Sequence, residues 1–131
     1  MCAVDYCEPW EVRRASYQRA RRAYGCVECG RRIAVGERYH KVVGLLDGYW
    51  STHRTCQHCD ALGGVMGVLC NGYPIGGLYD ELTEHWREGY ASVRLGRWVV
   101  AMKHGWRAGA AEVPTGCAEH AGELLRAWVR S

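Results

Sequence analysis

Cys26-Val27-Glu28-Cys29-Gly30 and Cys56-Gln57-His58-Cys59 enclose the stretch that decides the fold. Each is a C-x-x-C pair, which holds two thiolates within one turn of backbone. Two such pairs can close a tetrahedron around one zinc ion, with Zn–S bonds of about 2.3 Å. The spacing therefore predicts one structural Zn²⁺ site. Its four expected ligands are Cys26, Cys29, Cys56 and Cys59.

The segment between the two pairs predicts a β-hairpin. Residues 37–46 are rich in β-formers, Asp47-Gly48 suits a two-residue turn because both positions tolerate positive φ, and residues 49–54 return as a second strand. Thr55 is expected to cap a helix that begins at Cys56 and ends at Asn71-Gly72. A Cys-x-x-Cys-Gly knuckle, a hairpin and a helix in this order resemble the treble-clef arrangement of zinc fingers.

The glycines Gly63, Gly64 and Gly67 fall inside this expected helix. Glycine disfavours helix, so we expect close backbone approach to the hairpin or to a later helix there. Three further helices follow, with apolar stripes around Leu82, Val99 and Leu124, and Ser92 is a plausible cap for the second of them. Residues 12–24 fit a basic helix or an extended arm.

The predicted fold class is α+β: a small zinc-bound treble clef packed against a helical carboxy-terminal half. We expect one domain over residues 1–131, with the zinc module at 20–72 and the helical subdomain at 73–131. No apolar stretch approaches the roughly 18 residues of a membrane span, and residues 1–5 lack the basic start and apolar core of a signal peptide. The expected location is therefore the cytoplasm. There, zinc is a better explanation of eight cysteines than a disulfide framework.

A second candidate metal site combines the two ends of the chain. Cys117-Ala118-Glu119-His120 is a C-x-x-H pair, and domain termini often lie close together. The candidate ligands are Cys2, Cys7, Cys117 and His120. The alternative is a buried Cys117, an exposed helical His120 and a frayed amino terminus.

Catalysis is not expected at the first site. Four thiolates leave no open position on the metal for water, so the zinc would be structural and the protein a non-enzyme. Some His-Me finger (HNH) nucleases share the scaffold, with a histidine base in the hairpin and metal ligands on the helix. His40 or His53 could serve as the base and His58 as a ligand. However, no asparagine lies between the pairs, and Asp60 stands where a histidine would be expected, so nuclease activity is the third alternative.

The expected function is non-enzymatic binding of a macromolecule. Arginine is concentrated before the hairpin, and Trp50 lies at its turn; such residues dominate protein–protein hot spots, so a protein partner is favoured. Nucleic acid is the runner-up, because the net charge is only +3 and Glu28 and Glu37 are interspersed. A solvated basic face is the alternative to both. The candidate binding residues are Arg13, Arg14, Arg19, Arg21, Arg22, Arg31, Arg32 and Trp50.

Four motifs in the first half of the chain resemble one group of proteins. They are Cys-x-x-Cys-Gly-Arg-x-Ile at 26–33, Gly-Glu-x-Tyr at 36–39, Asp-Gly-x-Trp at 47–50 and Cys-x-x-Cys at 56–59. Together they look like small zinc-finger proteins of unassigned role that are encoded by bacteriophages and prophages. The resemblance implies a phage accessory protein in the host cytoplasm, and the favoured partner is then a host protein that it modulates. It implies no particular biochemical activity.

Overall fold

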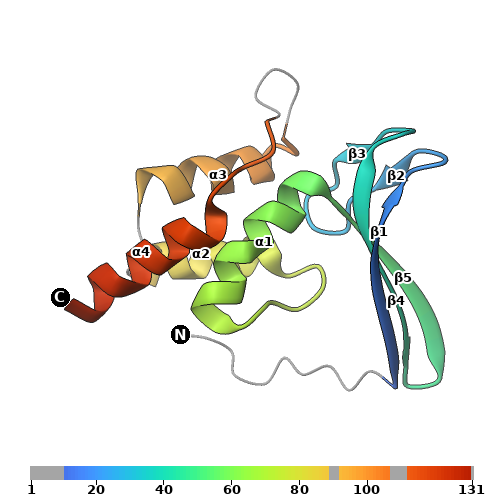
Figure 1. The fold of residues 1–131 in the computed structure, drawn as a ribbon, viewed down its shortest axis with the longest axis horizontal. Coiled ribbons are helices and arrows are strands. Elements are labelled where there is room, and N and C mark those ends of the chain that lie inside the picture. Colours follow the sequence, from blue (N-terminus) through green and yellow to red (C-terminus); the bar gives the residue numbers. More distant parts are fainter. Residues whose placement is uncertain (1–10, 89–91, 107–111, 131) are drawn as a thin grey trace.

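The computed structural model describes residues 11–88, 92–106 and 112–130, the last three of these by backbone alone. Across these residues the fold is α+β, with a small antiparallel sheet and four helices (Figure 1). The elements are β1 (Val12–Arg19), β2 (Tyr24–Gly25), β3 (Arg32–Ile33), β4 (Arg38–Leu46), β5 (Tyr49–Cys56), α1 (Gln57–Cys70), α2 (Leu78–Glu88), α3 (Val93–Lys103) and α4 (Cys117–Arg130).

The predicted hairpin is confirmed as β4 and β5. Asp47 and Gly48 take the positive φ values of 51° and 79° that a two-residue turn needs, and they join Leu46 to its partner Tyr49. The strand β1 adds to the other edge of β4 and pairs with it antiparallel along its whole length, so the sheet order is β1-β4-β5. Of the two alternatives for the segment before the first cysteine pair, the extended one is therefore right and the basic helix is wrong.

The sheet projects away from the helices, which gather on one side of the molecule (Figure 1). All eight residues of β1 are exposed to solvent. The sheet meets the helical body at its base, where β5 runs directly into α1. The distal part of the sheet is therefore held by its own hydrogen bonds and by its attachment at the base.

Helix α1 begins one residue later than predicted. Its N-cap is Cys56 in extended conformation, with no side-chain capping bond, and the expected cap Thr55 is instead a buried residue of β5. Thr55 is paired opposite His40 in the ladder, which keeps it in the strand. The helix ends as expected, because Asn71 adopts a left-handed φ of 58° and donates its backbone N–H to the carbonyl of Met66.

The core lies between the helices, and its largest fully buried side chains include those of Leu62, Met66, Leu82, Leu95 and Met102. Helix α1 packs along α4, and α2 packs against α3 (Figure 1). The predicted cap of α3 is confirmed, since the Ser92 hydroxyl accepts the N–H of Leu95 at 3.0 Å.

None of the helices within the described ranges is long and apolar enough to cross a membrane. The division into a module at 20–72 and a subdomain at 73–131 stays a prediction.

The glycines of α1 differ in what surrounds them. A Cβ on Gly63 would lie 2.9 Å from the ring of Tyr73, and one on Gly64 would lie 3.7 Å from the backbone nitrogen of Ala118 in α4. A Cβ on Gly67 would meet nothing within 4 Å. Close approach to a later helix is thus present at Gly64, whereas Gly63 makes room for a side chain.

These surroundings predict opposite effects of alanine. Gly67→Ala should raise the free energy of unfolding by up to about 1 kcal/mol, because alanine is the better helix former. Gly63→Ala should lower it by about 1–3 kcal/mol, because the methyl group overpacks the site against Tyr73. Urea denaturation of the two variants measures both changes. Equal stabilisation by both substitutions would contradict the packing described here.

Candidate functional site

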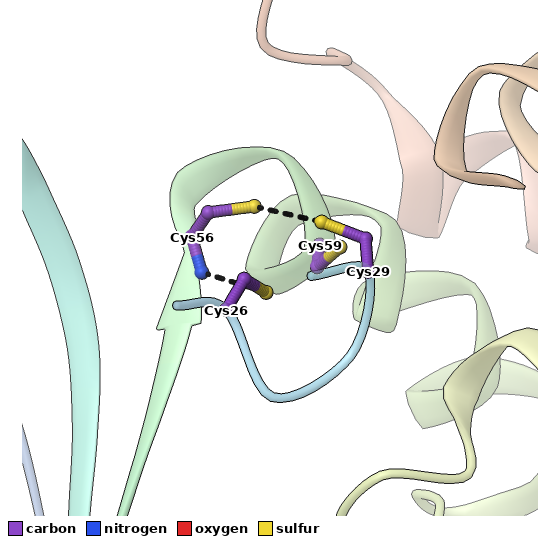
Figure 2. Close-up of side chains that lie close together, drawn as sticks. All are labelled: Cys26, Cys29, Cys56 and Cys59. Atoms are coloured by element: carbon purple, nitrogen blue, oxygen red, sulfur yellow. Dashed lines mark hydrogen bonds between the residues drawn. The ribbon is translucent and has the colours of Figure 1, made fainter. Parts of the chain in front are cut away.

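The two cysteine pairs meet at the base of the sheet, as Figure 2 shows. The four Sγ atoms lie within 4.8 Å of one another, and this is the one group of potential metal ligands found in the described part of the chain. Cys26 and Cys29 come from the turn between β2 and β3, Cys56 ends β5 and Cys59 lies in the first turn of α1. Cys29 is partly buried and the other three are buried. The group could hold a metal ion.

Backbone N–H groups point at two of these sulfur atoms. The N–H of Arg31 donates to Cys29 Sγ at 3.3 Å, and the N–H of Cys56 donates to Cys26 Sγ at 3.3 Å. Gly30 makes the first of these contacts feasible, because its φ of 75° turns the chain back after Cys29. Such donors favour the charged thiolate over the neutral thiol.

The four thiols also shift one another's pKa values in opposite directions. A hydrogen bond with Cys29 lowers the pKa of Cys26 to about 7, and a hydrogen bond with Cys26 holds the pKa of Cys56 far below that of an ordinary thiol. The pKa values of Cys29 and Cys59 are raised, chiefly by their hydrogen bonds with Cys26. A bound dication would favour all four thiolates, because cysteine ligands must be deprotonated.

Trp106 connects the cluster to α3. Its indole Nε1–H donates to Cys59 Sγ at 3.4 Å, and its ring lies 5.2 Å from that of His58. Trp106 follows the end of α3 with a φ of 53°, directly after Gly105 with a φ of 66°. The sequence pattern places this tryptophan in the apolar stripe predicted around Val99 and does not indicate its contact with the cysteines. Gly105 was the available signal, since a glycine just after a helix indicates that the next residue lies outside it.

Glu28 connects the first cysteine pair to α2. Its carboxylate accepts the N–H of Gly76 at 2.8 Å and that of Leu78 at 3.0 Å, and so satisfies backbone donors at the start of the helix. Burial raises the pKa of Glu28, against the opposite effect of these two donors. The loop that carries Cys26 and Cys29 is therefore bound to the helical body by hydrogen bonds of its own.

The second candidate site has two ligands outside the described residues, Cys2 and Cys7. Cys117 is buried, and burial raises the pKa of its thiol to about 11. His120 Nε2 lies 2.9 Å from the Ser92 hydroxyl, and its Nδ1 lies 3.5 Å from the carboxylate of Glu123. A metal at His120 would have to displace one of these contacts. The second site stays a prediction.

The histidines considered for catalysis have structural contacts. His58 is buried beside Trp106, and His40 Nδ1 lies 3.9 Å from a carboxylate oxygen of Asp60. His53 Nε2 lies 3.2 Å from the hydroxyl of Ser51 in the same strand. Contacts of these kinds orient side chains and do not by themselves assemble a base and a metal ligand.

The predicted binding residues fall into three groups. Arg31 donates two hydrogen bonds, of 2.9 and 3.1 Å, to the carboxylate of Glu37. The two charges offset each other, so Arg31 adds no net positive charge to the surface. Three of the arginines lie on β1, and Trp50 lies on β5. Two of the other three precede β2, and the third lies in β3. The members of the last two groups are Arg13, Arg14, Arg19 and Trp50, and then Arg21, Arg22 and Arg32.

Two further cations of the sheet, Lys41 and Arg54, are not among the binding residues predicted from the sequence. They lie opposite each other on β4 and β5. The alternation of side chains along a hairpin was the signal that could have found them.

Comparison of the chain with protein-family models, with curated proteins and with solved structures found no match.

The indole donor of Trp106 can be tested without removing its ring. Trp106→Phe should weaken metal binding by about tenfold, because outer partners of metal ligands typically contribute that much or more. Competition with a chromophoric chelator measures the affinity. Trp98→Phe is the matched control and should leave the affinity unchanged, because Trp98 lies within α3 and contacts His120 instead of the cluster. Equal effects of the two substitutions would show that the Trp106–Cys59 bond does not support the site.

Proposed function

We propose that this protein is a non-enzymatic binding protein in which one Zn²⁺ holds a treble-clef module together. The observation that carries the proposal is the convergence of four thiol groups from three elements within 4.8 Å. A set of four sulfur ligands suits zinc or iron–sulfur chemistry rather than the hard cations, which prefer oxygen. Zinc is the better fit, because a closed tetrahedron of two C-x-x-C pairs is typical of its structural sites.

The proposed metal ion would cross-link the sheet to the helices. Cys56 and Cys59 lie on either side of the junction between β5 and α1, so one ion would fix the angle at which the hairpin leaves the helix. Cys26 and Cys29 would add the loop that also contacts α2 through Glu28. Because all four positions on the ion would be filled by sulfur, no site remains on it for water or substrate.

What the metal would hold in place is the projecting sheet. Its first strand is exposed along its full length, and exposed side chains at the hairpin tip include Tyr49 and Trp50. Aromatic side chains of this kind are common in binding sites. The proposed activity is therefore binding of a macromolecule through the sheet.

Metal content tests the proposal directly. The purified protein should contain one zinc per chain by elemental analysis, and Cys56→Ser should contain much less, because it lacks one of the four thiolates that close the tetrahedron. Cys117→Ser is the matched control, a buried cysteine outside the cluster, and should keep the zinc bound by the four-cysteine cluster. A metal-free protein with a cooperative thermal transition would contradict the proposal.

The nuclease alternative makes a separate prediction. With Mg²⁺ or Mn²⁺ added, the protein should not cleave single- or double-stranded DNA or RNA, since the histidines have structural contacts. Gel analysis of labelled substrates is the measurement. Cleavage that disappears in both His40→Ala and His58→Ala would replace the proposed function with an enzymatic one.

A further inference from the structure

The positive charge of the protein is concentrated in the projecting sheet. Its three long strands carry six cationic side chains and no acidic one, although the whole chain carries a net charge of only +3. The remainder of the chain is therefore net acidic. The two glutamates that interrupt the basic sequence are withdrawn from the sheet, because Glu28 caps the start of α2 and Glu37 pairs with Arg31. The six cations are Arg13, Arg14, Arg19, Arg38, Lys41 and Arg54.

The strand register divides these side chains between two faces. Residues directly opposite each other in an antiparallel pair share a face, and neighbours along a strand alternate. The face that carries Trp50 therefore also carries its row partners Leu45 and Val12. We call this the Trp50 face, and the opposite one, which carries Tyr49, the Tyr49 face.

The Trp50 face combines an exposed aromatic ring with cations. Behind the tip row lies the row of Arg14, and behind that the row of Lys41 and Arg54. Successive rows on one face are about 7 Å apart, so the aromatic ring and the last row of cations span about 14 Å. Trp50 is 64% exposed.

The Tyr49 face is different, because a carboxylate reaches it. Asp60 of α1 accepts a hydrogen bond from the hydroxyl of Tyr17 at 2.9 Å and lies 3.9 Å from His40, and both residues belong to this face. The Asp60 carboxylate repels anions near the base of the Tyr49 face. The register gives the Trp50 face no acidic residue among the described strands.

One further cation, Arg22, lies at the base of the Trp50 face. The guanidinium of Arg54 lies 4.0 Å from the ring centroid of Tyr24, and that of Arg22 lies 5.4 Å from it. The Tyr24 pKa lies below its usual range, chiefly because Arg22 hydrogen-bonds to it and also because Arg54 and Lys41 are close. The positive potential of the face thus continues from Arg14 to Arg22.

We infer that the Trp50 face binds single-stranded nucleic acid, with Trp50 stacking on an unpaired base and Arg14, Lys41 and Arg54 contacting the phosphates. This inference rests on the proposed function, since the zinc site would hold the sheet in place. The cations of the Trp50 face favour a negatively charged polymer as the ligand. The exposed indole favours a polymer that also has flat rings on which it can stack. Single-stranded chains meet both requirements, because their bases are free to stack on aromatic side chains.

Duplex nucleic acid and acidic proteins fit the face less well. The base rings of a duplex are already stacked on one another, and its major groove admits a helix or a two-stranded ribbon rather than a three-stranded sheet. An acidic peptide offers charge without a ring for Trp50. Both are therefore comparison ligands in the test.

Fluorescence anisotropy with a labelled 12-nucleotide single strand tests the inference. We expect binding to the zinc-loaded protein that weakens with salt, with a slope of about −2 in log K against log[salt] for three phosphate contacts. Trp50→Ala should weaken binding by about tenfold, as expected for loss of one stacked base. Arg14→Ala should flatten the salt slope by about 0.7.

The alternation of the sheet supplies matched controls. Tyr49→Ala and Arg13→Ala remove an aromatic ring and a cation from the Tyr49 face. These residues are sequence neighbours of Trp50 and Arg14, and all four side chains are exposed. These two variants should change affinity by about twofold or less, because Tyr49→Ala removes no charge and Arg13→Ala removes only a screened charge on the opposite face. Equal losses from both faces would overturn the inference.

The comparison ligands complete the test. DNA and RNA single strands should both bind, whereas a duplex of the same sequence and polyglutamate should bind more weakly. Equal or tighter binding of the duplex or of polyglutamate would overturn the inference. If the protein contains one zinc per chain but binds no single strand, the inference fails and the proposed function stands. A zinc-free protein overturns the proposed function instead.

Discussion

The convergence of four sulfur atoms is the constraint on which the rest of the structure depends. Cys56 and Cys59 lie at the junction of strand and helix, and the loop of Cys26 and Cys29 closes the group from the other side. From there, hydrogen bonds continue outward: Trp106 connects the cluster to the end of α3, and Glu28 connects it to the start of α2. Four thiolates this close repel one another unless a cation neutralises their charge, so metal binding and folding of this region would be coupled.

Local patterns in the sequence predicted most of the elements. The Asp47-Gly48 turn fixed the hairpin, and the Ser92 cap marked the start of α3, because both depend on residues a few positions apart. The cysteine pairs likewise predicted their own convergence. Contacts between distant segments were not accessible in this way. Pairing of β1 with β4 turned an ambiguous basic segment into a strand, and the ladder kept Thr55 from capping α1.

The distribution of charge over the surface also depends on contacts that local sequence patterns do not predict. The net charge and the glutamates near the arginines weakened the case for a nucleic-acid partner at the level of sequence. In the fold, Glu28 and Glu37 are engaged elsewhere, and the three long strands keep only cations. Arginines that are adjacent in sequence also separate onto opposite faces, as Arg13 and Arg14 do. A linear count of charge cannot show either effect, because both depend on the register of the strands.

Hydrogen–deuterium exchange before and after chelation is the most direct test of the role given to the four thiolates. If one metal ion fastens the sheet to the helices, chelation should remove amide protection from residues 24–70, with the junction of β5 and α1 affected first. Readdition of zinc should restore it. Unchanged protection of this region in the chelated protein would show that the cysteine cluster does not hold the fold together.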